Sequence, residues 1–290
     1  MRGGGRASLR IAWDLARSLL RSPLRLARSA PAAETPEVVG RPGRSQDPLG
    51  PRLLVVSWNI HRAYDRPGVV RGLALILEEL DPDLLLLQEV PLGADRGWWE
   101  EREPAALLAG WHLAWAAMHR VDRASSYYPF AASGQLIAAR TPLLDAAALC
   151  LPQVSVPKLG VGHRVCRNAL RAAVVAGGQK VGVANLHLEN TARPAGRALQ
   201  LAAALDAVPP GPSILAGDLN TAFGPAEPLH RVARRAGYRR VALSGRSRLL
   251  PALDHVLVRG LRGADGRRLP VRGSDHRPVT AVVELPDGGG

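Results

Sequence analysis

Short, almost wholly apolar runs recur along this 290-residue chain, and most of them end abruptly in polar residues. A strand that is apolar at every position is buried on both faces, whereas a strand with one face in water alternates apolar and polar side chains. The runs therefore predict sheets that are covered on both sides. They are Leu53–Val56, Leu84–Leu87, Leu136–Ala139, Val181–Ala184, Ser213–Ala216, Val256–Val258 and Val279–Val283.

Two segments between these runs have helical spacing of their apolar residues. Residues 68–80 show this periodicity before the turn Asp81-Pro82-Asp83. A second helix is expected over about 194–207, with Pro194 in its first turn, where proline is tolerated. Helices between strands that are buried on both faces predict an α/β or α+β fold with helices on both sides of the sheets.

The composition is that of a globular chain. Hydrophobic residues make up 47% and charged residues 22%, which is too apolar for a disordered chain and too mixed for a membrane bundle. At ~100–200 residues per domain, one large domain is the simplest interpretation of the length. Cys150 and Cys166 exclude a disulfide-rich scaffold and a four-thiolate zinc site. Either a single bridge joins them or they are two small apolar residues, and we favour the second.

The net charge of +13, from 38 basic and 25 acidic side chains, favours anionic partners. Nucleic acid, anionic lipid and phosphorylated small molecules all fit such a charge, which does not choose among them.

Residues 1–50 are predicted to be a tail and a linker. Nine arginines against four acidic residues give this segment +5 of the total charge. Within Arg6–Arg28, arginines at helical spacing are interleaved with leucine, isoleucine and tryptophan. This basic amphipathic pattern either lies on an anionic membrane surface or packs on the domain. From Pro31 to Pro51 the Pro, Gly and Ser content is typical of a linker.

No apolar run near the start reaches the ~18 residues that a membrane span requires, and Asp14, Arg17 and Arg21 interrupt any secretory signal. We therefore expect a cytoplasmic monomer, in which residues 1–30 are the candidate segment for peripheral membrane contact. The expected organisation is a tail and linker over 1–50, one catalytic domain over 51–286 and a short Gly-rich end at 287–290.

Polar residues that suit metal or phosphate chemistry stand at the ends of the apolar runs. They are Asn59, Glu89, His187, Asp218, Asn220, Asp254, Asp275 and His276. Polar groups at successive strand ends meet at one edge of packed sheets, where such folds bind ligands. A carboxylate such as Glu89 suits Mg²⁺, which takes only one or two protein carboxylates and completes its shell with water and phosphate oxygens.

Neighbouring pairs within these motifs allow a local prediction. Asp218 and Asn220 lie two apart, so on an extended segment they face the same side, one to accept a proton from water and one to position phosphate. In Asp254-His255 and in Asp275-His276, adjacent residues point to opposite faces, so the useful partner of each acid is expected elsewhere in the chain. The motifs of zinc peptidases, P-loop proteins and serine hydrolases are absent from the sequence.

Taken in order, these motifs resemble the endonuclease/exonuclease/phosphatase family over about residues 52–285. The residues that carry the resemblance are Ser57-Trp58-Asn59, Gln88-Glu89, Asn185-Leu186-His187-Leu188, Gly217-Asp218-Leu219-Asn220, Asp254-His255 and Ser274-Asp275-His276. The resemblance implies a four-layer sandwich in which two mixed β-sheets pack face to face with helices on both outer faces. It also implies Mg²⁺-dependent hydrolysis of phosphoester bonds, with Mn²⁺ as a substitute.

The resemblance assigns the metal side of the site residue by residue. Glu89 matches the principal metal ligand, Asn59 a neighbour that contacts metal or phosphate, and Asp275 a residue at the metal-side edge. His255 occupies a position that varies in the family and receives no role. Members of the family differ over whether one or two metal ions act, and that question stays open here.

The same resemblance assigns the phosphate side. Asp218 matches the residue that activates or orients the attacking water, and Asn220 a phosphate-positioning group. His276 is expected to bind the scissile phosphate and stabilise developing charge. Asp254 matches the acid that in this family supports a catalytic histidine. His187 matches the histidine that contacts phosphate or assists the leaving group.

The substrate is less constrained than the chemistry. AP endonucleases usually have tyrosine where this chain has His187, so the resemblance favours the deoxyribonuclease, sphingomyelinase and phosphatase branches. Nucleic acid, a phospholipid head group or a small phosphodiester is the expected substrate. The alternative is a catalytically idle member that binds anionic lipid or nucleic acid. The absence of a matched metal-binding residue would indicate that alternative, and every matched metal-binding residue is present in the sequence.

Two groups of residues outside the motifs have competing interpretations. For Trp111 and Trp115 we favour core positions over stacking on bases or lipid, and we leave Trp98 and Trp99 open between the two. Arginines and an asparagine near the strand ends either reach phosphate or lie on the surface, and we favour the surface. They are Arg167, Asn168, Arg193 and Arg197.

Overall fold

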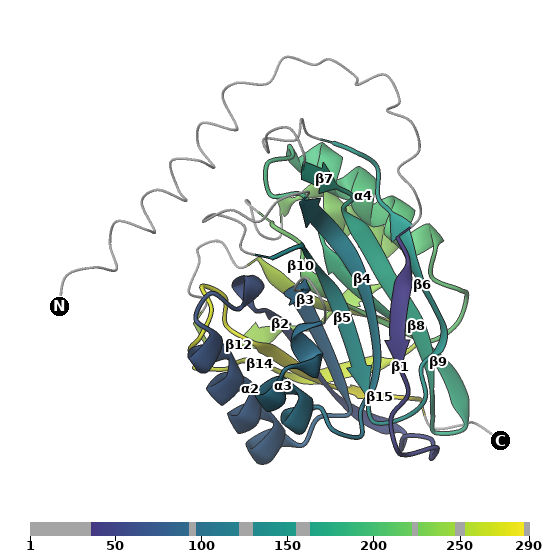
Figure 1. Cartoon of the computed structure of the whole chain (residues 1–290). Coiled ribbons are helices and arrows are strands. Elements are labelled where there is room, and N and C mark those ends of the chain that lie inside the picture. The colour runs from purple at the N-terminus through teal and green to yellow at the C-terminus, as the bar shows by residue number, and fades with distance from the viewer. Residues whose placement is uncertain are drawn as a thin grey trace.

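The computed structural model describes residues 36–92, 97–121, 130–154, 163–221, 226–246 and 253–286 (Figure 1). Within these ranges the chain forms two β-sheets, one of nine strands and one of six. The amphipathic tail within residues 1–30 and the Gly-rich end at 287–290 lie outside the described residues.

The larger sheet has the strand order β1-β4-β5-β3-β2-β15-β14-β12, with β7 paired to β4. It is mixed, because β2 with β3 and β12 with β14 run parallel while the other neighbours are antiparallel. Its strands are β1 (Val38–Arg41), β2 (Arg52–Asn59), β3 (Leu84–Leu92), β4 (His112–Val121), β5 (Ala132–Ala139), β7 (His163–Val165), β12 (Leu243–Ser244), β14 (Arg262–Arg268) and β15 (Val279–Glu284).

The smaller sheet has the strand order β11-β13-β10-β9-β8-β6. It is also mixed, since β9 and β10 run parallel and the other neighbours are antiparallel. Its strands are β6 (Leu144–Cys150), β8 (Asn168–Ala176), β9 (Gln179–His187), β10 (Ser213–Asp218), β11 (Arg239–Arg240) and β13 (Asp254–Arg259).

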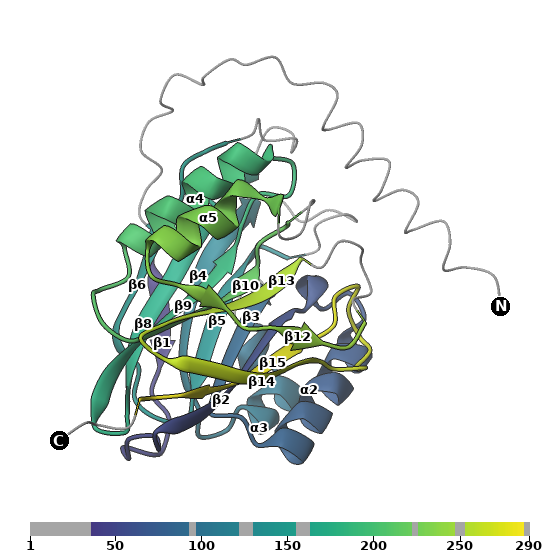
Figure 2. The same cartoon turned by 180° about the vertical axis from the view of Figure 1, so that it is seen from behind.

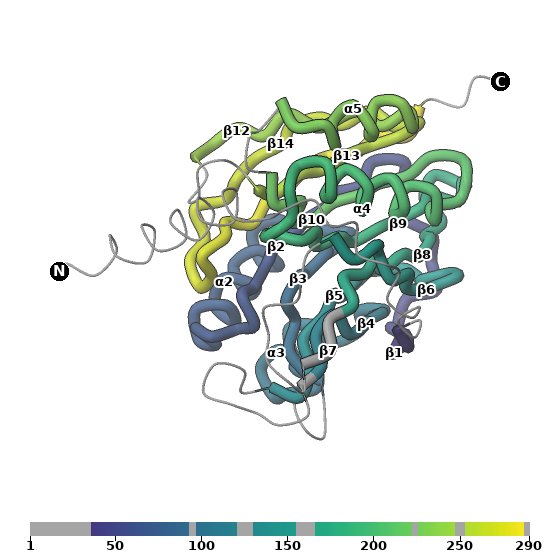
Figure 3. Tube along the Cα trace, turned by 90° about the horizontal axis from the view of Figure 1, so that it is seen from above, coloured from purple at the N-terminus to yellow at the C-terminus, as the bar shows by residue number. Residues whose placement is uncertain are grey.

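Helices cover the outer faces of both sheets. On the larger sheet these are α2 (Arg66–Leu80) and α3 (Arg102–Leu107), with the short turns η1 (His61–Ala63) and η2 (Trp98–Glu100). On the smaller sheet α4 (Pro194–Asp206) and α5 (Pro228–Arg235) lie side by side (Figures 2 and 3). Among the described residues, every helix is too short or too polar to cross a membrane.

Three apolar clusters produce this order of layers. Val55 of the larger sheet and Ile214 of the smaller one belong to the central cluster between the sheets. Their chain neighbours turn the other way, Val56 toward α2 and Leu215 toward α4. Burying a side chain of this size contributes roughly 1.5–3 kcal/mol. The wholly apolar runs therefore have both faces covered, and the predicted four-layer sandwich is confirmed.

The larger sheet begins inside the segment that the sequence assigned to a linker. There β1 pairs with β4 in antiparallel register, and Leu49 forms a bridge with Ala176 of the smaller sheet. The Arg41 guanidinium donates to the carbonyl oxygen of Leu108 over 2.9 Å. Prolines around β1 suggested a free linker, but proline is compatible with an edge strand because one side of that strand needs no partner.

The tryptophans between residues 98 and 115 all belong to the core. Trp98, Trp99, Trp111 and Trp115 are each no more than 3% exposed. The rings of Trp99 and Trp115 lie 5.3 Å apart between centroids, in a tilted arrangement. The core interpretation is therefore confirmed for Trp111 and Trp115. Trp98 and Trp99, for which the sequence left two interpretations open, are also core residues.

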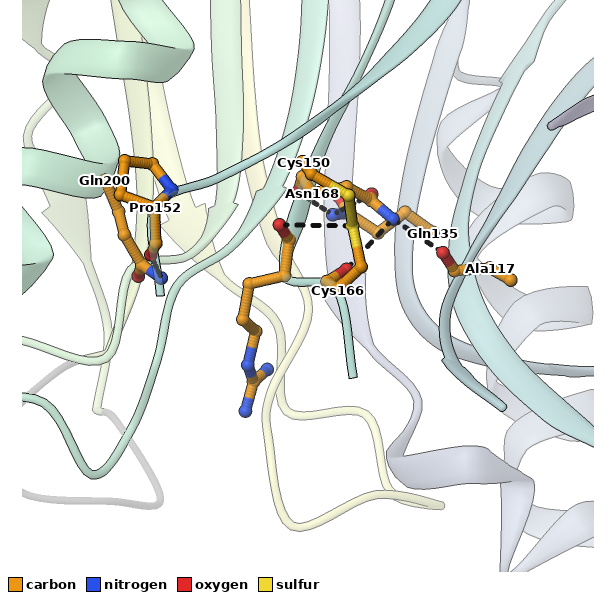
Figure 4. The surroundings of a disulfide bond; sticks show 8 residues. Ala117, Gln135, Cys150, Pro152, Cys166, Asn168 and Gln200 are labelled. Carbon is orange, nitrogen blue, oxygen red and sulfur yellow. Dashed lines mark hydrogen bonds between the residues drawn. A yellow bond between two sulfur atoms is a disulfide. The ribbon is translucent and has the colours of Figure 1, made fainter. Parts of the chain in front are cut away.

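Cys150 and Cys166 form a disulfide bond, with their Cα atoms 5.6 Å apart (Figure 4). The preference for two separate apolar residues was wrong. Because β6 pairs with β8 and sets Cys150 opposite Asn168, the chain two residues earlier comes within bridging distance of Cys150. The sequence did not show that these two strands are neighbours, so it could not place the sulfur atoms together.

Candidate active site

Strand register brings three predicted residues into one row at the end of the smaller sheet. Asp218 is the last residue of β10, and it lies opposite His187 of β9 and Asp254 of β13. Residues that are directly paired across neighbouring strands point to the same face. The Nε2 atom of His187 accordingly lies 3.5 Å from Oδ2 of Asp218.

A bulge in β3 directs Glu89 toward this row. Leu85 and Leu87 face the helices, and strict alternation would turn Glu89 the same way. Glu89 instead has a left-handed backbone with φ 56°, and the register with β5 shifts between Leu87 and Val90. Bulges of this kind re-aim side chains next to active sites. Here the bulge brings Oε1 of Glu89 to 3.4 Å from Nδ2 of Asn59.

Asn59, at the end of β2, connects the two sheets at the site. Its Nδ2 lies 3.1 Å from Oδ2 of Asp218 as well as near Glu89. Its Oδ1 accepts the backbone N–H of His61 over 2.9 Å, and its backbone carbonyl oxygen accepts from Ser274 over 2.6 Å. The amide nitrogen thus faces two carboxylates, while the side-chain oxygen has one lone pair left for a further contact.

His276 precedes β15 of the larger sheet and is held by Asp254 of β13 in the smaller sheet. Its Nδ1 lies 3.0 Å and 3.1 Å from the two carboxylate oxygens of Asp254, and its Nε2 lies 3.5 Å from Oδ2 of Asp218. His255, the chain neighbour of Asp254, turns away and lies 2.8 Å from the Thr221 hydroxyl. The acid and the imidazole that are adjacent in the sequence therefore have separate partners, as the alternation argument predicted.

The electrostatics of this group follow from burial and from close opposite charges. Burial alone would lower the pKa of His276, but the Asp254 and Asp218 carboxylates outweigh it and hold that pKa well above its ordinary value. Burial raises the pKa of Asp218 to about 6, against the opposing effect of the His276 charge. At neutral pH His276 is therefore protonated and Asp218 is close to its titration range.

His187 lies in a positively charged environment. Burial lowers its pKa well below the ordinary value, and the charges of Arg167, His119, His276 and Arg62 lower it further. Within the described part of the chain, its Nδ1 atom is buried without a hydrogen-bond partner. A neutral imidazole surrounded by cationic groups suits an anion such as a phosphate group.

The Gly-Asp-Leu-Asn motif departs from the extended geometry that the sequence suggested. Gly217 is required because a Cβ atom there would lie 1.9 Å from the carbonyl oxygen of Leu186. Asn220 has φ 51°, so the chain turns after Asp218 instead of continuing as a strand. Its backbone N–H donates to Oδ1 of Asp218 over 3.0 Å, and its Nδ2 donates to the Leu188 carbonyl oxygen over 2.9 Å. Asn220 is thereby fixed beside Asp218 by the turn.

Asp275 lies at the rim of the site. Its Oδ1 is 3.5 Å from Nδ1 of His61 and 3.2 Å from the Ser274 hydroxyl. A cavity of about 790 Å³ opens beside these residues and is lined also by Tyr64, Asp65, residues 270–273 and Arg277. This volume is in the usual range for small-ligand sites. Of the predicted site residues Asp275 lines this cavity, whereas Glu89, Asp218 and His276 do not.

Buried amides hold the two sheets together behind the site. Nε2 of Gln88 donates to Oδ1 of Asn185 over 2.8 Å, and Nδ2 of Asn185 donates to the Leu136 carbonyl oxygen over 2.9 Å. Nδ2 of Asn168 donates to the Ala117 carbonyl oxygen over 2.7 Å. Asn168 is fully buried, so its assignment to a solvated strand start was wrong.

Two of the arginines expected on the surface are also buried or nearly so. Arg197 is 1% exposed and forms a two-pronged ion pair with Glu227, at 3.1 Å and 2.7 Å. Arg167 lies with its Nε 3.4 Å from Glu189 Oε2, and its side chain is 10% exposed. Helical spacing alone did not show that α5 and its preceding turn pack over this side of α4.

Arg62 contacts Glu89 directly and was missed by the sequence analysis. Its Nε lies 3.1 Å from Oε2 of Glu89, and both side chains are largely buried. The only available signal was its position three residues after Asn59, which no periodicity or motif marked.

The donor set around Glu89 fits a hard divalent cation. A carboxylate and an amide oxygen are ligands of the kind that Mg²⁺ prefers. Oε2 of Glu89 already attracts a cationic group, the guanidinium of Arg62. Deeper in the site, Asp218, Asp254 and His276 each offer a ligand atom within 4.8 Å of the others, although Asp254 and His276 are bonded to each other.

Comparison with known proteins agrees with this architecture. The model of the endonuclease/exonuclease/phosphatase family matches residues 56–276, from β2 to His276. The chain belongs to this family. The match runs from the strand that ends in Asn59 to the last predicted site residue, and members of the family are typically metal-dependent phosphoester hydrolases. Among curated proteins, none matches the chain.

Solved structures with the same fold share little sequence with the chain. An endonuclease/exonuclease/phosphatase from Beutenbergia cavernae is 23% identical, with a TM-score of 0.61 over 81% of this chain and 72% of that one. The human Nocturnin catalytic domain with bound sulfate is 18% identical, with a TM-score of 0.61 over 85% and 100%. TDP2 of D. rerio with a single-strand DNA product is 17% identical, with a TM-score of 0.54 over 81% and 99%.

Proposed function

We propose that this family member hydrolyses phosphodiester bonds with the help of Mg²⁺ or Mn²⁺. The observation that carries the proposal is the buried arrangement of Asp218 between the Asp254–His276 pair and Asn59, with Glu89 on the other side of Asn59. It combines an acid near its titration range, a protonated imidazole and a carboxylate that suits a metal ion. Phosphoryl transfer needs such groups, because its catalysis consists largely of positioning and charge stabilisation.

Asp218 is the base in this proposal. Its pKa of about 6 makes it ionised at neutral pH yet basic enough to accept a proton from water. The Asn59 amide and the Asn220 backbone N–H hold its two oxygens in place. A water molecule beside Asp218 would be oriented for attack on a phosphorus atom bound between the two sheets.

His276 and His187 are the phosphate-binding groups. His276, kept protonated by Asp254, donates a charged hydrogen bond to a phosphate oxygen. His187 is neutral and lies against Asp218 from the neighbouring strand, where it contacts phosphate or assists the leaving group. Asn220 positions the phosphate from the turn that follows β10.

Glu89 would hold the divalent cation, with Asn59 next to it and Asp275 at the outer edge. Such an ion, when bound, supplies neutralisation of negative charge on the phosphate oxygens. In this proposal the remainder of the substrate extends past Asp275 into the cavity that Asp275 and His61 line.

Two classes of phosphoester substrate are supported by charge and similarity. The net charge of +13 favours a polyanion, and the similar structure of TDP2 holds a single-strand DNA product. An anionic lipid head group fits the basic pattern of residues 1–30 equally well.

A substrate panel tests the proposal. The purified full chain is incubated with Mg²⁺ or Mn²⁺, with and without EDTA, and presented with plasmid DNA, sphingomyelin, phosphatidylinositol phosphates and bis-p-nitrophenyl phosphate. We expect hydrolysis of at least one of them, abolished by EDTA and lowered by orders of magnitude in Asp218→Asn.

The control is Asp145→Asn, an exposed carboxylate on β6 that pairs with Lys180 and should retain full activity. Failure to hydrolyse any substrate with either metal would support the catalytically idle alternative.

A further inference from the structure

Arg62 stands on a strained turn that leads out of the site. His61, Arg62 and Ala63 all have left-handed φ angles, of 48°, 55° and 50°. Such a conformation is unfavourable for a residue other than glycine and persists only where its surroundings hold it. Oδ1 of Asn59 holds the start of this turn through the His61 N–H, and strain of this kind concentrates at functional sites.

The turn places the guanidinium of Arg62 on Glu89. The distance from Nε to Oε2 is 3.1 Å, and the side chains are 13% and 16% exposed. The guanidinium carbon also lies over the ring of Tyr64, 5.1 Å from the ring centroid, in a cation–π contact. Arg62 therefore lies against one of the two carboxylate oxygens that a metal ion at Glu89 could bind.

The Arg62 charge also reaches the phosphate side of the site. It is one of the cationic charges that lower the pKa of His187 on the opposite sheet. A guanidinium matches the geometry of a phosphate group and binds it through two parallel hydrogen bonds. Because two cations near one carboxylate oxygen repel each other, a metal ion at Glu89 would displace Arg62 toward such an anion.

We propose that Arg62 is a phosphate-binding residue. It pairs with Glu89 in the metal-free protein and turns to the substrate phosphate when a divalent cation binds. This inference rests on the proposed function, because it presumes that the phosphate of the substrate binds between the sheets. It adds a residue outside the motif series and a reason for the strained turn. It also makes metal binding and phosphate binding interdependent.

Calorimetric titration of Mg²⁺ alone tests the first half of the proposal. Arg62→Ala should bind Mg²⁺ roughly three- to tenfold more tightly than the unmodified protein, because it removes the competing cation. Arg62→Lys should stay near the original affinity, since lysine retains the charge. The control Arg71→Ala removes an exposed arginine from α2 and should change nothing. If Arg62 only positions Glu89, the alanine variant will bind Mg²⁺ more weakly, and the competition is refuted.

Titration of inorganic phosphate into the Mg²⁺-saturated protein tests the second half. Arg62→Ala should weaken phosphate binding by roughly 10- to 100-fold, and Arg62→Lys should also weaken it because lysine lacks the two-pronged geometry. Unchanged phosphate affinity in Arg62→Ala would overturn the phosphate role.

Neither titration requires turnover, so an inactive protein would count against the proposed function without deciding the role of Arg62. Melting temperatures of all variants separate these effects from loss of folding. If Arg62→Ala melts early, Arg62→Gln, which also removes the charge, replaces it in both titrations. Unchanged Mg²⁺ affinity or unchanged phosphate affinity in Arg62→Gln would contradict the corresponding half of the proposal.

Discussion

Asp218, Asp254 and His276 form a chain of groups in which the charge of each depends on the next. Asp254 holds the proton on His276, and His276 in turn opposes the effect of burial on the pKa of Asp218. Such coupled groups titrate together, so the pH dependence of the rate reports on all three groups and not on one of them. The neutral-pH state that the structure favours is a protonated His276 facing an ionised Asp218.

Replacing Asp254 by asparagine should move the pH profile. The amide keeps the shape but removes the charge that holds the pKa of His276 up, so burial lowers that pKa and His276 loses its proton as pH rises through neutrality. We expect kcat/KM to fall by roughly 10²–10⁴ at pH 8 and by less at pH 6. The rate of bis-p-nitrophenyl phosphate hydrolysis between pH 5 and 9 measures this.

Asp206→Asn, an exposed acid on α4, is the control and should keep the original profile. In the unmodified protein the acid side should fall near pH 6, where Asp218 becomes protonated. A loss of equal size at every pH would show that Asp254 does not act through the charge of His276.

At the scale of single residues, the sequence predicted which residues belong to the site better than it predicted their contacts. Asn59, His187 and Asp218 end their strands, which periodicity reveals, whereas Glu89 lies at a bulge inside β3. The separation of Asp254 from His255 followed from strand alternation. The turn at Asn220 and the placement of Arg62 depend on left-handed backbone angles. Residues other than glycine rarely adopt these angles, so no composition signal marks them.

At the scale of elements, each of the two sheets contributes one histidine beside Asp218. His187 ends β9 of the smaller sheet, while His276 precedes β15 of the larger one, and both contact Oδ2 of Asp218 over 3.5 Å. Single alanine variants of each should lower kcat by roughly 10²–10⁴. The double variant should lose less than the product of the two factors, because residues that act as a unit are not additive.

Fully additive losses in that cycle would place the two histidines in separate events. Thermal denaturation belongs with the kinetics, since buried structural histidines would lower stability and leave the rate of the folded protein unchanged.

The disulfide joins the end of β6 to the chain just before β8. It closes a loop with a sequence separation of 16 residues, for which the chain-entropy model gives about 3 kcal/mol of stabilisation. In denaturant unfolding, the reduced protein should have a free energy of unfolding that is lower by about this amount. The double variant Cys150→Ala with Cys166→Ala should match the reduced protein, and reductant should not change its stability. Two free thiols in the unfolded, non-reduced protein would contradict the bond.

The fold class was easier to predict from the sequence than which strands and helices lie side by side. Wholly apolar runs required both sheet faces to be covered, and helical periodicity located α2 and α4 to within about two residues. The edge strand β1, the disulfide and the buried Arg197–Glu227 pair all depend on which elements lie side by side. Single-sequence periodicity carries no information about such long-range pairings.

At the scale of the whole molecule, the catalytic domain carries a basic segment at its start. We propose that residues 1–30 bind an anionic membrane surface and take no part in the chemistry. A deletion for this test should end at residue 35, because β1 begins at Val38 and belongs to the larger sheet. The shortened protein should hydrolyse a small soluble phosphodiester as fast as the full chain.

The same deletion should weaken sedimentation with anionic vesicles, most strongly at low salt, since basic residues near such a surface contribute about 1 kcal/mol each. Equal sedimentation of both proteins would refute the membrane role, and aggregation of the shortened one would indicate packing on the domain. The cytoplasmic location stays an expectation, and the disulfide weighs against it because disulfides persist mainly in oxidising compartments.

The central claim is that hydrolysis depends on a divalent cation held by Glu89. The most direct test measures turnover of Glu89→Gln as a function of Mg²⁺ concentration, beside the exposed α2 variant Glu79→Gln. Glutamine matches glutamate in shape but lacks the negative charge that a cation requires. We predict that Glu89→Gln loses activity by orders of magnitude at an unchanged melting temperature, while Glu79→Gln behaves as the unmodified protein. Near-native turnover of Glu89→Gln at limiting Mg²⁺ would contradict the metal site and the function built on it.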